Sequence, residues 1–262
     1  MLRPAVDDPG QTMRIESASA TNRGRIRDVN ADAVALYPKL GLFAVADGVG
    51  TDRGGDVAAR IAVECLKGWF SRPTTRWPAP GVAPQGQELM WSMRHAVEEC
   101  HRRILQESHR AMGRSGMATT LAGLAFRRGQ TVVAHVGDSR VYRLRSGQLT
   151  RLTRDHSFVQ DLVDRGMMDP AKAKSSPMGH VILRAVGLEE RFEVEARTVD
   201  IEPGDVALLC TDGLSGEVSD PDLGAILSTR APVRVMVEAL VDAALQRGAS
   251  DNVSCVVLRR HA

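Results

Sequence analysis

The stretch TTLAGLAFRRGQTVVAHVGDSRVYRLRSG (residues 119–147) decides the fold of this chain. It contains three apolar, β-branched runs, with turn residues Gly129–Gln130 after the first and Ser146–Gly147 after the third. Short apolar runs joined by such turns predict β-hairpins, in which neighbouring strands run antiparallel. The middle of the chain is therefore expected to build antiparallel β-sheet.

Helical patterns lie on both sides of these hairpins. Apolar residues spaced three and four apart predict helices over Gly55–Phe70, Glu88–Met112, Phe158–Gly166 and Val233–Gln246. Runs bounded by glycine or aspartate predict strands over Gly41–Ala46, Thr119–Phe126, Thr131–Val136, Val141–Arg145, Glu193–Val199, Val206–Cys210 and Val253–Leu258. This order of elements predicts an α+β fold with antiparallel sheets and argues against a doubly wound fold.

The domain organisation is expected to be simple. Residues 1–12 contain turn formers and little to bury, which predicts a flexible N-terminal arm. The proline-rich stretch Ser71–Gly86 separates two helical patterns that could not fold alone, so we expect a surface loop within a domain. The remaining residues, 13–262, are then one domain of ordinary size.

Composition excludes several classes of protein. With 34 Lys and Arg against 32 Asp and Glu, the net charge of +2 lacks the basic excess of a dedicated nucleic-acid binder. No apolar segment approaches the ~18 residues that cross a bilayer, and no leader-like segment opens the chain. Cys65, Cys100, Cys210 and Cys255 are too scattered for a zinc ribbon or a disulfide scaffold. We therefore expect a cytoplasmic protein.

Four apolar runs are bordered by an aspartate. Asp47, Asp138 and Asp212 each follow one run, and Asp251 opens another. A single Asp-Gly pair is usually only a turn, but strands that share sheets would bring four such carboxylates together at one end. Two carboxylates ~4 Å apart repel by ~4 kcal/mol at an effective dielectric of 20, so a cation is needed among them. Because oxygen ligands favour Mg²⁺ or Mn²⁺ over zinc, the sequence predicts a site for a hard metal ion.

The residues exclude several other kinds of site. In the glycine-rich segment after Asp47, the third glycine of a dinucleotide fingerprint arrives one residue late, at Gly54. Val49 and Thr51 break the pattern of an EF-hand loop. The sequence has no Cys-x5-Arg, no DxDx[TV] and no Gly-x-Ser-x-Gly motif, so no covalent nucleophile stands out. Attack by a metal-activated water fits this pattern.

Six short motifs follow one another in a specific order, at Arg27–Asp32, Asp47–Gly50 with Gly54–Gly55, Gly116–Thr120, Val136–Arg140, Thr211–Leu214 and Ser250–Ser254. From about Arg14 to Arg259, the chain resembles the metal-dependent serine/threonine protein phosphatases of the phosphatase 2C type, in their compact bacterial form. The resemblance implies two antiparallel β-sheets packed as a central sandwich between helical layers. It also implies hydrolysis of phosphoserine and phosphothreonine on proteins.

The resemblance further implies a centre of two or three Mn²⁺ or Mg²⁺ ions that activates the attacking water. Asp47 would bridge two ions, and the Gly48 carbonyl would bind one of them. Asp212 and Asp251 would complete the ligands of the other ion. Asp138 matches the residue that helps to hold a third ion in bacterial members, with a carboxylate that merely stabilises its turn as the alternative.

Three further residues have implied supporting roles. Arg27 matches the arginine that binds the substrate phosphate, for which its planar fork is suited, and an ordinary salt bridge is the alternative. Asp32 is expected to support the metal ligands through hydrogen bonds or a metal-bound water, and Asn252 is expected to lie just behind these ligands.

The proton donor for the leaving group is not evident from the resemblance. Val49 stands where animal members carry a histidine that has been proposed as the general acid. His156 could replace it, because histidine titrates near neutral pH. A structural role for His156 is the favoured interpretation, and another group or a metal-bound water would then supply the proton.

Residues 155–184 correspond to the variable flap of the family, beside the active site. Met167, Met168 and Met178 give this segment either an adaptable surface for substrates or packing beneath a loop. The implied partners are phosphorylated proteins and an opposing bacterial kinase of the eukaryotic type, and we expect a monomer. Alternatives are a phosphatase for a small ester or for a phosphoserine regulator in a partner-switching cascade, and a non-catalytic sensor module.

Ala31 occupies a position where the family usually has Glu or Gln in contact with a metal-bound water. Because that contact is missing, we predict weaker metal binding than in relatives. Ala31→Glu is therefore expected to lower the Mn²⁺ concentration at which activity is half-maximal, as measured by metal titration of both proteins. An unchanged metal dependence would contradict this prediction.

Overall fold

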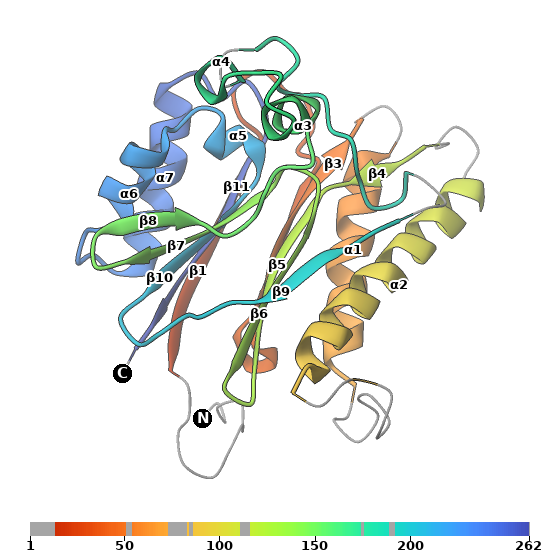
Figure 1. Cartoon of the computed structure of the whole chain (residues 1–262), viewed down its shortest axis with the longest axis horizontal. Helices are drawn as coiled ribbons and strands as arrows, with labels where there is room; N and C mark the ends of the chain where they lie inside the picture. The colour runs from red at the N-terminus through yellow and green to blue at the C-terminus, as the bar shows by residue number, and fades with distance from the viewer. Residues whose placement is uncertain are drawn as a thin grey trace.

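Two antiparallel β-sheets form the centre of the computed structural model, which describes residues 14–50, 54–72, 83, 86–110, 116–173, 176–188 and 192–261 (Figure 1). The first sheet has the order β1 (Ile15–Asn22), β11 (Val253–Arg260), β10 (Val206–Cys210), β7 (Arg140–Arg145) and β8 (Gln148–Arg151). The second has the order β2 (Asp32–Tyr37), β3 (Leu42–Val49), β5 (Leu121–Arg127), β6 (Gln130–Val136) and β9 (Glu195–Thr198), with β4 (Ala118–Thr119) paired to β3.

Helices cover the outer face of each sheet, as Figure 1 shows. The second sheet packs against α1 (Gly55–Phe70) and α2 (Glu88–Arg110). The first sheet packs against α5 (Asp212–Ser215), α6 (Asp220–Leu227) and α7 (Val233–Gln246). Two short helices, α3 (Phe158–Asp164) and α4 (Pro170–Ala173), lie above one end of the sandwich (Figure 1). The predicted α+β sandwich is confirmed.

Side chains of the central strands alternate between two apolar layers. On β3, Leu42, Ala44 and Ala46 face α1 and α2, whereas Phe43 and Val45 face the other sheet. Strands β10 and β11 alternate in the same way between the inter-sheet layer and the helices of the first sheet. Because both faces of these strands are covered, their sequences are continuous apolar runs rather than alternating patterns.

Both predicted hairpins are present. The turn between β5 and β6 is Arg128–Gly129, one residue earlier than expected, with φ of 47° and 74°. The turn between β7 and β8 is Ser146–Gly147, with φ of 50° and 79°. A positive φ at both central residues defines the type I′ turn, whose twist matches that of the flanking strands.

The predicted end of one strand is wrong. β3 continues through Asp47 and Gly48 to Val49, because β4 pairs with Gly48 and Val49 and extends the ladder. Asp47 consequently lies inside the strand, directly opposite Asp32 of β2. The carboxylate of Asp47 is thus positioned by a β-ladder and not by a turn.

Two edge strands were not predicted. β1 reads IESASATN and pairs with β11 along its whole length, and β2 is the edge of the other sheet. The residues of both strands are mostly half-buried, and in β1 small and polar side chains suffice. The short helices α4, α5 and α6 were also missed, and α3 and β9 are shorter than expected.

Some predictions fall outside the described residues. These are the arm at 1–12, most of the loop at 71–86 and the last two residues of the second predicted helix. All four cysteines are buried and free of disulfide bonds. Among the helices of the described part, none combines the length and the hydropathy that a membrane span requires.

Candidate active site

Five carboxylates meet at one end of the sandwich. Asp32 and Asp47 lie opposite each other on β2 and β3, and Asp138 lies where the chain crosses from β6 to β7. Asp212 begins α5 directly after β10, and Asp251 precedes β11. Both sheets contribute carboxylates to this cluster. The convergence of aspartates that the sequence predicts therefore occurs at the end that the two sheets share.

Burial and mutual repulsion raise the pKa values of four of these carboxylates, those of Asp32, Asp47, Asp138 and Asp212. Burial is the main reason that the pKa of Asp47 lies well above its usual value, and the charges of Asp212 and Asp32 raise it further. Burial likewise raises the pKa of Asp212, that of Asp32 to about 7 and that of Asp138 to about 8. Such carboxylates cannot all be ionised at neutral pH unless a cation compensates them.

Two oxygens in the cluster have no hydrogen-bond partner among the residues that the structure describes. Asp32 Oδ1 and Asp212 Oδ1 are buried without one. An unsatisfied buried acceptor costs ~1–3 kcal/mol, and more when it is charged. A hard divalent cation bound by carboxylate oxygens would satisfy these atoms and offset the repulsion, so the residues present fit Mn²⁺ or Mg²⁺.

Arg27 lies at the exposed edge of this cluster. Its Nη2 donates to Asp251 Oδ2 at 2.7 Å, and the two side chains are 47% and 34% exposed. The hydrogen bond and the charge of Asp251 raise the pKa of Arg27, and the charges of Asp47 and Asp212 add to this effect. The arginine thus remains a cation, partly open to solvent, within the field of the carboxylates.

Asn252 fixes the loop that carries Arg27. Its Oδ1 accepts from the Ala31 backbone at 2.7 Å. Its Nδ2 donates to the carbonyls of Arg23 at 2.8 Å and Val29 at 3.0 Å. The amide of Asn252 therefore joins the residues on both sides of Arg27 to the start of β11.

The backbone at Gly48 is unusually close to α1. A Cβ atom on Gly48 would lie 2.3 Å from the Gly55 carbonyl carbon, and one on Gly55 would lie 2.6 Å from that of Gly48. Only glycine at both positions permits this approach. The first turn of α1 is thereby held against the strand that carries Asp47.

Three threonines to which we assigned no role also hold the cluster. Thr120 Oγ1 accepts from the Asp47 backbone at 3.1 Å, and Thr119 Oγ1 donates to the Asp47 carbonyl at 2.8 Å. Thr211 Oγ1 donates to Asp32 Oδ2 at 2.9 Å. The three threonines lie within the motifs Gly116–Thr120 and Thr211–Leu214, but the motifs alone do not show which backbone or side-chain groups their hydroxyls contact.

His156 is held in a structural position. Its Nδ1 accepts from the Gly137 backbone at 3.2 Å, which leaves the proton of the neutral ring on Nε2, 3.3 Å from Glu195 Oε2. The ring stacks on His135 with centroids 4.7 Å apart. Burial and the neighbouring His135 lower the pKa of His156. This arrangement favours the structural interpretation over a general acid.

The segment 155–184, hereafter the flap, closes on itself at its base. A β-bridge joins Ser157 to Ile182, and the Leu183 backbone donates to the His156 carbonyl at 2.7 Å. Met167 and Met178 are 71% and 44% exposed, which favours a surface role for these two methionines.

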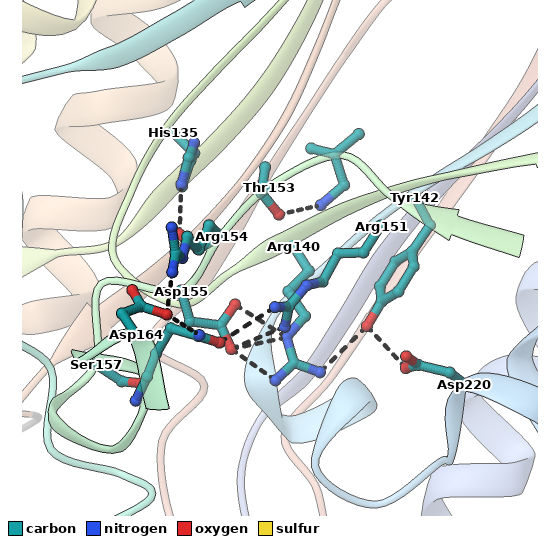
Figure 2. A network of polar contacts seen from close by, with 12 residues as sticks. His135, Arg140, Tyr142, Arg151, Thr153, Arg154, Asp155, Ser157, Asp164 and Asp220 are labelled. Carbon is teal, nitrogen blue, oxygen red and sulfur yellow. Dashed lines mark hydrogen bonds and ion pairs between the residues drawn. The ribbon is translucent and has the colours of Figure 1, made fainter. Parts of the chain in front are cut away.

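A groove of about 660 Å³ lies between the flap and α6. Its lining includes Asp138, Asp212, Arg140, Asp155 and Asp220. Figure 2 shows the polar network along this groove, in which Arg140 and Arg151 contact Asp155 and Tyr142 contacts Asp220. The groove therefore connects the carboxylate cluster to the flap.

Comparison with known proteins gives matches that span nearly the whole chain. A family model of protein phosphatase 2C matches residues 23–256. The serine/threonine phosphatase stp of Listeria welshimeri is 32% identical over 92% of this chain and 94% of its own length. The serine/threonine protein phosphatase PstP of Mycobacterium tuberculosis is 33% identical over 94% of this chain and 45% of its own length.

Solved structures agree with these matches. The crystal structure of the Mycobacterium tuberculosis serine/threonine phosphatase PstP/Ppp superimposes with a TM-score of 0.85 at 32% identity, over 95% of this chain and 99% of that one. The catalytic domain of PstP in complex with two manganese ions gives a TM-score of 0.80 at 32% identity, over 96% and 100% of the two chains.

These likenesses include every segment that contributes a carboxylate to the cluster. The protein is a metal-dependent phosphoprotein phosphatase. Within that class, it belongs to the protein phosphatase 2C family.

The cluster makes the effect of metal on stability depend on pH. In metal-free protein, the raised pKa values of Asp32 and Asp138 mean that their contribution to stability is greatest at low pH and is lost as the pH rises through 7 to 8. Metal therefore offsets the most repulsion at high pH, whereas protons compete with it at low pH. At 100 times the Kd, binding contributes about 2.7 kcal/mol, or roughly 5–10 °C in Tm.

We predict that Mn²⁺ raises the Tm of EDTA-treated protein more at pH 8 than at pH 6, as measured by calorimetry. His135 and His156, whose pKa values burial lowers, titrate in both forms and cancel in the difference. If Mn²⁺ raises the Tm by the same amount or by more at pH 6 than at pH 8, the carboxylates do not bind the ion.

Proposed function

We propose that the protein hydrolyses phosphoserine and phosphothreonine on proteins at an Mn²⁺ or Mg²⁺ centre held by Asp47, Asp212, Asp251 and the Gly48 carbonyl. The observation that carries this proposal is the carboxylate cluster, in which two buried oxygens have no hydrogen-bond partner among the described residues, with Arg27 at its exposed edge. Serine/threonine phosphatases among the relatives support the same substrate class.

The residues of the chain divide the work between binding and positioning. The bound ions would supply a water of lowered pKa as the nucleophile and offset the charge that develops on the phosphate. Arg27 binds the phosphate oxygens through its planar fork, oriented by its contact with Asp251. Asp32, held by Thr211, and Asn252, which anchors the Arg27 loop, keep these groups in place.

The proton for the leaving serine or threonine oxygen comes from solvent in this proposal. Val49 has no proton to give, and His156 is turned toward Glu195. The groove that borders Asp138 and Asp212 gives water access to the site. Asp138 is proposed to help hold a third ion, which its burial beside Asp212 supports.

We propose a cytoplasmic, monomeric enzyme with one catalytic domain, residues 13–262, that opposes a bacterial serine/threonine kinase of the eukaryotic type. Four free, buried cysteines are typical of a reducing compartment. A non-catalytic sensor would be expected to lack a core carboxylate, whereas all five are present.

Asp212→Asn tests the proposal, with Asp242→Asn on the exposed face of α7 as a matched control. Losing a metal ligand that stabilises charge by ~3–4 kcal/mol is expected to lower Mn²⁺-dependent hydrolysis of a phosphothreonine peptide roughly 10²–10³-fold. The control variant should retain wild-type activity.

Folding is checked separately by the Tm in EDTA. Metal-free Asp212→Asn is expected to be at least as stable as wild type, because one buried charge is removed from the cluster. Wild-type protein that is inactive with both Mn²⁺ and Mg²⁺, or a fully active Asp212→Asn, would refute the proposed function.

A further inference from the structure

One ion pair ties the base of the flap to the first sheet (Figure 2). Arg140, the first residue of β7, donates from Nε and Nη2 to the carboxylate of Asp155, the first residue of the flap, at 2.7–3.1 Å. The Asp155 side chain is only 8% exposed. Arg151 Nη1 approaches the same carboxylate at 3.3 Å. Two guanidinium groups thus hold this end of the flap.

Arg140 also reaches the opposite wall of the groove. Its Nη1 donates to Tyr142 Oη at 3.1 Å, and Tyr142 Oη donates to Asp220 Oδ1 at 3.1 Å. Asp220 is the first residue of α6. Because Arg140, Asp155 and Asp220 all line the groove, a single guanidinium connects its two walls.

The same residue is anchored beside the carboxylate cluster. Arg140 comes two residues after Asp138 and is the register partner of Cys210, the last residue of β10 before Thr211 and Asp212. The backbone that holds two members of the cluster therefore also holds the contact between the groove walls. A change in this contact would alter the groove beside the reacting phosphate.

We propose that the Arg140–Asp155 pair is a positioning element that sets the separation of the flap from α6 and so favours phosphorylated protein segments over small phosphate esters. The inference rests on the proposed function, since it assigns the groove to the protein part of the same substrate. A protein segment must fit between both walls, whereas a small ester needs only the cluster and Arg27.

Arg140→Lys is the most conservative test. Lysine keeps the positive charge but offers a single ammonium in place of the planar fork, so it cannot hold Asp155 at two points and Tyr142 at a third. The bulk of the buried side chain is largely retained. Asp155→Asn, which keeps the size of the partner and removes its charge, serves as a second variant.

The chain contains a matched control pair on the same strand. Arg145, the last residue of β7, donates from Nε and Nη2 to Asp205 at 2.9 and 2.7 Å. The Asp205 side chain is 3% exposed, so this pair is at least as buried as the other on its acidic side. It lies at the opposite end of β7 from the carboxylate cluster. Arg145→Lys thus reports the cost of losing a bidentate pair that does not border the groove.

We compare kcat and KM for phosphorylated casein and for para-nitrophenyl phosphate in the Mn²⁺-loaded full chain. In Arg140→Lys and Asp155→Asn, kcat/KM is expected to fall at least about tenfold further for phosphorylated casein than for the small ester, mainly through KM. In Arg145→Lys, the ratio of kcat/KM for phosphorylated casein to kcat/KM for the small ester should equal that of wild type. Equal losses for both substrates, or the same ratio in Arg140→Lys and Arg145→Lys, would overturn the proposal.

Hydrogen exchange gives a readout that needs no turnover. Amides of residues 157–173 should exchange faster in Arg140→Lys than in wild type and Arg145→Lys, because the base of the flap is released. Unchanged exchange there would refute the positioning role even if the enzyme is active. Inactive wild-type protein with the expected exchange pattern would instead refute only the proposed function.

Discussion

The repulsion among five carboxylates gathered at one end of the β-sandwich is the constraint on which the rest of the structure depends. Burial raises the pKa values of Asp47 and Asp212, and two oxygens of the cluster have no partner in the described structure. If this end of the sandwich served only the stability of the fold, apolar residues or paired charges would be expected there. The cluster is therefore a site prepared for cations, at a cost that the remainder of the fold offsets.

The tightly packed apolar layers of the sandwich hold the strands that carry these carboxylates in place. Both faces of the central strands are covered, so β3 and β10 cannot shift without disturbing two apolar layers. Close contact between Gly48 and Gly55 holds α1 against the strand that carries Asp47, and Asn252 holds the loop that carries Arg27. Groups from both sheets are thus fixed relative to one another before any ion or substrate binds, as efficient catalysis requires.

The parts of the fold that follow from local sequence could be predicted. Continuous apolar runs marked β10 and β11 because both their faces are buried, and helix α7 was predicted at its observed bounds. The edge strand β1 escaped detection because its half-buried positions accept serine, alanine and threonine, and β2, which reads DAVALY, was missed as well. The aspartates that border the strands were informative because several strands end together, which no single motif reveals.

Contacts between distant segments could not be predicted. Thr211 is 179 residues from Asp32, and its role as a hydrogen-bond donor exists only once the two sheets have packed. The partner of Arg140 became evident only from the path of the flap, and the stacking of His156 on His135 likewise depends on that path. A titratable side chain in a motif therefore indicated a site, whereas its orientation decided between catalytic and structural roles.

The central claim is that the carboxylate cluster binds divalent cations and that Asp47 would be one of the residues that hold them. Its most direct test is the number of Mn²⁺ ions bound per chain in equilibrium dialysis, for wild type and for Asp47→Asn. The account predicts more than one ion per wild-type chain and the loss of at least one in the variant, because Asp47 would be one of the residues that hold the ions. Less than one ion per wild-type chain, or equal binding by Asp47→Asn, would contradict it.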